Sequence, residues 1–163
     1  MPRDGVDRIV EQWAAERPDL DTTAMEVLGR VFRLARLAGD EMEPVYARFG
    51  IGRPEFDVLA TLRRAGEPYQ LSPGALASSM MISTGGTTAR IDRLEQARLV
   101  RRTPDPEDRR GVRVALTPRG RTLVDEALEA GLSRQQALLA QLPPARQRSL
   151  AGLLRDVLAP LER

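Results

Sequence analysis

Apolar residues recur every three or four positions along most of this chain, a spacing that predicts amphipathic helices. Each predicted helix begins or ends beside a proline or a glycine, the two residues that most readily interrupt helices. The helices predicted outside the central part of the chain cover approximately residues 3–17, 22–49, 52–66, 118–142 and 145–161. The pattern therefore predicts a mainly helical protein.

The first half of the central segment predicts two further, shorter helices. Ser72 followed by Pro73 provides an N-cap and a favourable first helical residue. Ser83 provides a second cap before a helix over residues 84–96, whose apolar positions lie three and four residues apart. Two short helices in this order predict a helix-turn-helix, in which the second helix enters the major groove of DNA.

The second half of the central segment predicts a β-hairpin. Residues 99–103 and 112–117 are rich in valine, leucine and threonine, and they flank a turn that contains two prolines and a glycine. A helix-turn-helix followed by a hairpin is a winged helix-turn-helix, a fold that binds duplex DNA. We therefore expect a mainly α fold with a small β-hairpin, in which the winged unit occupies residues 50–117.

The terminal segments, residues 1–49 and 118–163, predict long helices with wide apolar faces that a small winged domain cannot cover. The last helix carries such a face, made of Leu150, Leu153, Leu154, Val157, Leu158 and Leu161. We expect these segments to form a homodimer interface, which would place two DNA-reading helices about one turn of a palindrome apart. The alternative is that the terminal helices pack within one chain.

Charge supports DNA binding when it is counted locally. The whole chain has 25 Lys and Arg residues, all of them arginine, against 23 acids, for a net charge of +2. The segment from Arg90 to Arg121 holds 10 arginines and 5 acids, a net charge of +5, whereas the rest of the chain is net −3. The positive charge therefore concentrates on the winged unit, as a phosphate-binding surface requires.

Composition argues against several classes of function. The sequence has no cysteine and no histidine, which removes disulfides, thiolate chemistry, the commonest general base and the commonest neutral metal ligand. No Gly-rich phosphate loop or nucleophile elbow is present. We expect no enzymatic activity, no cofactor and no metal site. No apolar run approaches 18 residues, so we also expect a cytoplasmic protein without a membrane partner.

The order of these elements resembles the MarR family of bacterial transcription regulators over nearly the whole chain. Its most specific part is the wing, where residues 105–120, DPEDRRGVRVALTPRG, look like the family signature D-x-R…L-T-x-x-G. The resemblance implies that Arg110 enters the minor groove and that Asp108 helps to hold the wing. It also places two glycines, Gly85 and Gly86, in the first turn of the recognition helix, where each costs roughly 1 kcal/mol relative to alanine.

The residues expected to contact DNA lie on the recognition helix and on the wing. Arg93 is assigned either to a phosphate or to a partner within the chain. The full set is Ser83, Thr84, Gly86, Thr88, Arg93, Arg109 and Arg110.

A narrower resemblance concerns MarR proteins that respond to urate, which carry an extra N-terminal helix with a tryptophan. Their effector pocket is completed by an aspartate and two arginines, and the matching residues here are Trp13, Asp57, Arg90 and Arg102. Guanidinium groups offer paired donors and a stacking face to a planar anion. The resemblance implies a ligand-responsive regulator, most often a repressor in this family, that a small anionic effector releases from a palindromic operator. The effector would be urate-like or, as in related regulators, a tricarboxylate such as trans-aconitate.

Ordinary structural roles remain open for each of these four residues. A lone tryptophan is commonly a core or interface residue, and Asp57 can be a surface acid in the first turn of its helix. Arg90 can form an ion pair, and Arg102 can contact phosphate. For the whole protein, the alternative to a ligand-responsive regulator is an architectural DNA-binding protein with similar affinity for palindromic and random duplexes.

Overall fold

The computed structural model describes residues 3–80, 86–105, 108 and 111–162. Two compact units make up the chain, one up to Glu41 and one from Met42 onward, and each is described by itself. Helix α2, Thr23–Ala47, contributes residues to both. Within the described ranges, no helix combines the length and hydropathy that are needed to cross a lipid bilayer.

The first unit contains helix α1, Gly5–Glu16, and most of α2. The Asp4 carboxylate accepts hydrogen bonds from the backbone N–H groups of Val6 and Asp7. The Asp7 carboxylate accepts one from the backbone N–H of Asp4, which completes a capping box. Val6 is buried against Gly29 of α2, where a β-carbon would come within 3.2 Å of Val6 Cγ1. The small residue thus lets the two helices approach closely.

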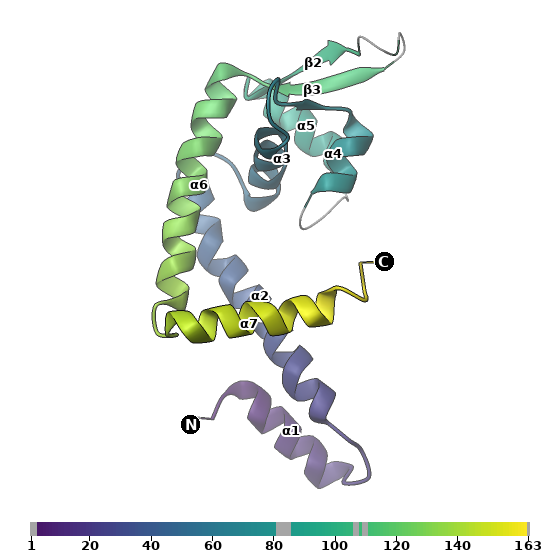
Figure 1. Cartoon of the computed structure of the whole chain (residues 1–163), viewed down its shortest axis with the longest axis vertical. Helices are drawn as coiled ribbons and strands as arrows, with labels where there is room; N and C mark the ends of the chain where they lie inside the picture. The colour runs from purple at the N-terminus through teal and green to yellow at the C-terminus, as the bar shows by residue number, and fades with distance from the viewer. Residues whose placement is uncertain (1–2, 81–85, 106–107, 109–110, 163) are drawn as a thin grey trace. The chain divides into compact units, whose positions relative to one another are not determined.

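The second unit has the order of a winged helix-turn-helix followed by two helices (Figure 1). Its strands form one antiparallel sheet in the order β1-β3-β2, and Val100 pairs with Leu116 at the base of the hairpin. The elements are α3 (Arg53–Arg64), β1 (Gln70–Leu71), α4 (Pro73–Ser79), α5 (Thr87–Gln96), β2 (Val100–Pro104), β3 (Val112–Leu116), α6 (Pro118–Leu139) and α7 (Pro144–Leu158).

The core of the second unit lies where α3 packs against α5 and α6. Helix α3 contributes Leu59 and Leu62, three residues apart on one face, and α5 contributes Ile91 and Leu94 in the same spacing. All four side chains are at most 1% exposed. Truncation of such a leucine to alanine typically costs about 2–5 kcal/mol, so this packing fixes α5 relative to α3.

The predicted fold class is confirmed, with two differences in detail. The hairpin is part of a sheet with a third strand, β1, whose residue Gln70 pairs with Ala115. Helix α5 begins at Thr87, so Gly86 is its N-cap and does not lie in its first turn. The expected free-energy cost of glycine within the helix was therefore wrong for Gly86, because its φ of 71° is a left-handed conformation that favours glycine.

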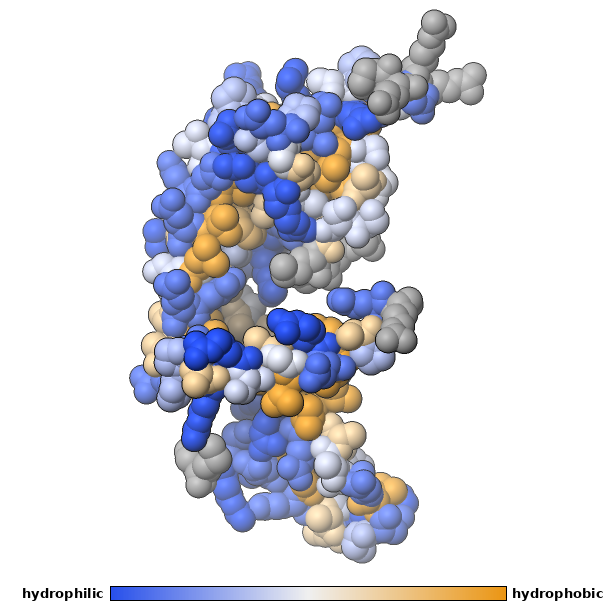
Figure 2. All heavy atoms as spheres, viewed as in Figure 1, coloured by the Kyte–Doolittle hydropathy of each residue, from blue (hydrophilic) through white to orange (hydrophobic). Residues whose placement is uncertain are grey.

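Apolar side chains remain exposed on the helices after the wing. Helix α7 has no buried residue, and Leu153 and Leu158 on it are 66% and 51% exposed. On α6, Leu128 and Leu132 are 40% and 47% exposed, and Figure 2 shows hydrophobic side chains in orange along this helix. The described residues of one chain thus leave the expected apolar faces uncovered.

Candidate nucleic-acid interface and effector cavity

The recognition helix α5 is positioned by buried contacts on one face and presents polar residues on the other. Thr87, Ile91 and Leu94 are buried, whereas Gly86 and Thr88 are exposed. Among the residues expected to contact DNA, Ser83, Thr84, Arg109 and Arg110 lie outside the described residues. The exposure of Gly86 and Thr88 is compatible with DNA contact, which stays a prediction.

Arg93 on α5 has a partner within the chain. Its Nε and Nη2 atoms donate to the same oxygen of Glu55 on α3, over 2.9 and 2.6 Å. The Glu55 side chain is only 14% exposed, whereas that of Arg93 is 58% exposed. Arg93 thus has an intrachain partner that joins α5 to α3, and its contact with a phosphate stays a prediction.

The base of the wing is closed by an ion pair that the sequence analysis missed. Arg113 on β3 donates to Asp105 over 2.9 Å, and the Asp105 side chain is 11% exposed. The backbone N–H of Asp105 donates to the Gly111 carbonyl, and that of Gly111 donates to the Asp108 carbonyl, both over 2.9 Å. The backbone of Asp108 thus takes part in the wing turn, and Asp105 closes its base.

Arg102 lies on β2 and contacts the recognition helix. Its guanidinium group donates to the carboxylates of Asp92 and Glu95, and its backbone N–H donates to Glu95 over 3.0 Å. The pKa of Arg102 is raised, and the hydrogen bond to Asp92 contributes most to this increase. Before it could hold an effector, Arg102 would have to leave these two carboxylates.

A cavity of about 610 Å³ opens between the end of α2, α3 and α6. Tyr46 and Phe56 stack in its wall with ring centroids 4.2 Å apart, and burial raises the pKa of Tyr46. The lining consists of Met42, Tyr46, Arg53, Phe56, Asp57, Ala60, Arg63, Arg64, Val124, Asp125, Leu128, Leu132 and Gln135. The wall is thus mainly apolar, and its polar positions hold three arginines, two aspartates and a glutamine.

Asp57 is the one predicted effector residue in this lining. It is 7% exposed, so the interpretation of Asp57 as a surface acid was wrong. Arg63, also in the lining, is bound to Asp125 of α6 over 2.8 Å. Arg90 on α5 and Arg102 on β2 do not line this cavity. The structure therefore places the aspartate in the cavity wall and the two arginines outside this wall.

The chain is similar to known proteins over most of its length. A sequence model of the MarR family matches residues 49–111. The transcriptional regulator PecS of Dickeya dadantii is 38% identical over 149 residues, which cover 91% of this chain and 90% of PecS. The chain belongs to the MarR family. MarR-family proteins are transcription regulators that bind DNA, and PecS itself carries the name of a regulator of this kind.

Solved structures of other proteins share the fold of this chain. A mutant of MarR from E. coli in complex with operator DNA is 26% identical, has a TM-score of 0.71, and covers 90% of this chain and 97% of its own. BpsR of Bordetella bronchiseptica is 27% identical with a TM-score of 0.71, over 80% of this chain and 91% of its own, in a structure that concerns regulation of DNA binding by 6-hydroxynicotinic acid.

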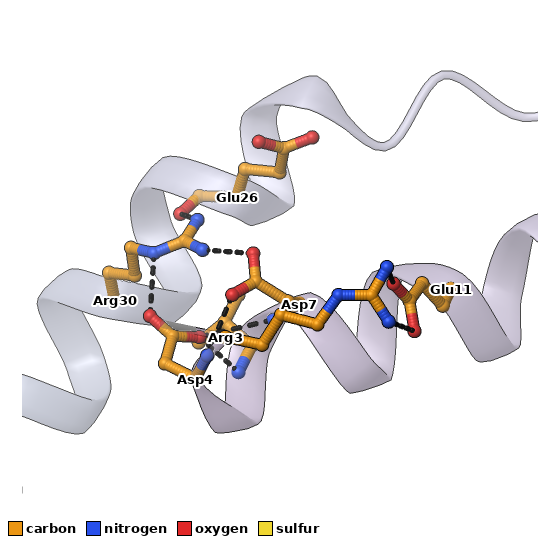
Figure 3. A network of polar contacts seen from close by, with 7 residues as sticks. Arg3, Asp4, Asp7, Glu11, Glu26 and Arg30 are labelled. Carbon is orange, nitrogen blue, oxygen red and sulfur yellow. Dashed lines mark hydrogen bonds and ion pairs between the residues drawn. The ribbon is translucent and has the colours of Figure 1, made fainter. Parts of the chain in front are cut away.

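The remaining predicted effector residue of this MarR-family chain, Trp13, lies in the first unit. Its helix is fastened to α2 by Arg30, whose guanidinium group donates to Asp4 over 2.9 Å, to Asp7 over 2.5 Å and to the Glu26 carbonyl over 2.9 Å (Figure 3). Trp13 is 44% exposed. It is therefore not a core residue of this unit, and its role toward an effector stays a prediction.

Arg30→Gln should make the attachment of α1 more sensitive to acid. The hydrogen bond from the Asp7 N–H, helped by those from Val6 and Arg30, lowers the pKa of Asp4 from its ordinary value of 3.8. A lowered pKa means that the charged form stabilises the fold, fully above the ordinary value and progressively less as pH falls through the lowered one. In an acid titration followed by Trp13 fluorescence, Arg30→Gln should begin its transition at higher pH than the parent.

The control for Arg30→Gln is Arg36→Gln, which removes an exposed pair with Asp40 on the same helix. This pair is four residues apart within α2 and does not join α2 to α1. Its removal should leave the fluorescence transition where it is in the parent. Identical titrations of all three proteins would contradict the role of Arg30 in attaching α1 to α2.

Proposed function

We propose that this protein is a ligand-responsive regulator that binds a palindromic operator as a homodimer and is released from it by a small anionic effector. The observation that carries the proposal is the cavity between α2, α3 and α6, with the buried Asp57 in its wall. A mainly apolar cavity with a few converging polar groups is the usual form of a small-molecule site. Because α3 also packs against the recognition helix, a ligand in its wall is well placed to act on DNA affinity.

Exposed apolar side chains support the proposed dimer, and the local positive charge supports the proposed binding to an operator. The exposed leucines of α6 and α7 offer an apolar area that a second copy would cover. The net charge of +5 between Arg90 and Arg121 suits a phosphate surface, as does the likeness to MarR bound to operator DNA. Release would follow if the effector binds more tightly to a conformation whose two recognition helices no longer match the operator.

The chemistry around Asp57 favours a planar anion that carries N–H groups. A carboxylate beside an anion is unfavourable unless an arginine pairs with it or the ligand donates a hydrogen bond to it. A urate-like ring provides such donors, whereas a tricarboxylate brings only further negative charge. The nearby Arg53 and Arg64 would balance the ligand charge, and the stacked Tyr46 and Phe56 would bound a flat ring. Trp13, Arg90 and Arg102 remain predicted contributors from outside this lining.

A ligand series on the parent protein and on Asp57→Asn tests this proposal. Urate, trans-aconitate and salicylate should be compared by thermal shift, by Trp13 fluorescence and by release of a labelled palindromic duplex. We expect urate to raise the melting temperature and to release DNA, since binding to the folded state stabilises it. Asp57→Asn should need about tenfold more urate, because a hydrogen bond to a charged group typically contributes about 1.5–3 kcal/mol.

The matched control is Asp156→Asn, the same substitution at an exposed position on α7. It should respond to urate like the parent. A response to trans-aconitate alone would overturn the N–H argument and leave the cavity as the site of a tricarboxylate. No response to any of the three anions, or equal affinity for palindromic and random duplexes, would contradict the proposal of a ligand-responsive regulator and favour an architectural protein.

A further inference from the structure

The recognition helix carries two acids on the side that faces the wing. Asp92 and Glu95 lie three residues apart on α5, so both point to one face of the helix. Their side chains are 49% and 38% exposed. In a segment of net charge +5, carboxylates on a DNA-reading helix repel phosphate and weaken binding unless they have another task.

Both acids are bound by one arginine of the wing. The Arg102 guanidinium group donates to Asp92 through Nη2 and to Glu95 through Nη1. The other oxygen of Glu95 accepts the backbone N–H of Arg102 over 3.0 Å. Arg102 pairs with Val114 in the sheet, so these contacts join α5 to the β2–β3 hairpin. A planar guanidinium group that meets two carboxylates fixes direction as well as distance.

We propose that Asp92, Glu95 and Arg102 are positioning residues that hold the wing and the recognition helix in one geometry for DNA. Each of these elements must meet its own groove at the same time, and a wing that moved freely against α5 would lose entropy on binding. The contact fixes that geometry before DNA arrives. This inference rests on DNA binding by the family and requires no effector.

The direction in which one substitution changes the affinity for DNA distinguishes this positioning role from simple electrostatics. Glu95→Gln removes a negative charge from the DNA-binding segment, so electrostatics alone predicts tighter binding. If Glu95 positions the wing, Glu95→Gln should instead weaken operator binding by about fivefold, a coupling typical of a charged pair in contact. The salt dependence should stay that of the parent, because no phosphate contact has been lost.

Arg102 is tested by Arg102→Lys and Arg102→Gln in the same operator titrations. Lysine keeps the charge but cannot hold both carboxylates in a planar fork, so Arg102→Lys should weaken binding about as much as Arg102→Gln. In a double-mutant cycle, Arg102→Gln combined with Glu95→Gln should bind no more weakly than either single variant, within about twofold. Thermal melting and the active fraction measured by stoichiometric titration establish that each variant is folded.

Three results would overturn the inference. One is a Glu95→Gln protein that binds as tightly as the parent or more tightly. Another is an Arg102→Lys protein that binds like the parent, since Arg102 would then act through its charge alone. The last is a loss of about one unit of salt dependence in Arg102→Gln, which would assign Arg102 to a phosphate. A failure of this kind would leave the effector proposal untouched, since that proposal is read out by ligand-induced release.

Discussion

Gly120→Ala is expected to destabilise the protein by at least about 3 kcal/mol, because the new methyl group has no room in a packed site. A β-carbon at Gly120 would lie 1.9 Å from the carbonyl oxygen and 2.8 Å from the carbonyl carbon of Leu99. These are backbone atoms, which cannot turn aside as the end of a flexible side chain can. In a chain of this length, such a loss corresponds to a fall in melting temperature of roughly 10 °C.

The surroundings of Gly120 explain why the clash cannot be relieved cheaply. The Thr117 hydroxyl accepts the backbone N–H of Gly120 over 3.0 Å and lies 2.8 and 3.1 Å from the carbonyl oxygens of Arg98 and Leu99. The first turn of α6 is thereby attached to the turn between α5 and β2. Movement of α6 away from Leu99 would break these contacts.

The control for Gly120→Ala is Gly74→Ala, the same substitution at an exposed position of helix α4. A β-carbon at Gly74 meets nothing within 4 Å. Alanine there should be neutral or stabilise by up to about 1 kcal/mol, since glycine is the poorer helix former. Melting curves of parent and variants should be measured at one protein concentration, because a dimer gains stability with concentration. Equal melting of Gly120→Ala and the parent would contradict the close packing of α6 on Leu99.

Local sequence patterns were sufficient to predict most of the regular elements. Apolar spacing, the Ser72 cap and the prolines at helix starts each act within a few residues, so they identify α3, α4, α6 and the hairpin. Strand β1 was not predicted, because it has only two residues and is defined by its pairing with β3. The start of α5 was misplaced because Gly86 adopts a left-handed conformation that its neighbours do not reveal.

The site was harder to predict, because its contacts join residues far apart in the chain. Arg93 binds Glu55 at a separation of 38 residues, and the sequence near either residue does not indicate this pair. Arg102 was expected to serve an effector because it matches a family position, yet here it is bound by two acids of α5. Asp57 fits a surface acid and a buried one equally well in sequence, and only the packing of α3 decides between them.

Arg110→Ala should weaken operator binding by roughly 1–3 kcal/mol, or about 5- to 150-fold, while the fold and the dimer stay intact. The motif implies a wing arginine that enters the minor groove, where the negative potential attracts a guanidinium group. Arg110 itself lies outside the described residues, and the ion pair of Asp105 with Arg113 joins the described ends of the hairpin strands. The measurement is a titration of labelled operator at several salt concentrations, with melting curves as the check on folding.

Arg146→Ala is the matched control, because it removes the same charge from an exposed position on α7, outside the basic segment. A general loss of positive charge would weaken both variants alike, whereas a groove contact weakens Arg110→Ala alone. The comparison also separates two roles for the wing. A phosphate contact would lower the salt dependence by about one unit and affect all duplexes equally, whereas a minor-groove contact would also reduce the preference for the operator over a random duplex. Operator binding by Arg110→Ala equal to that of the parent would show that the wing arginine does not contact DNA.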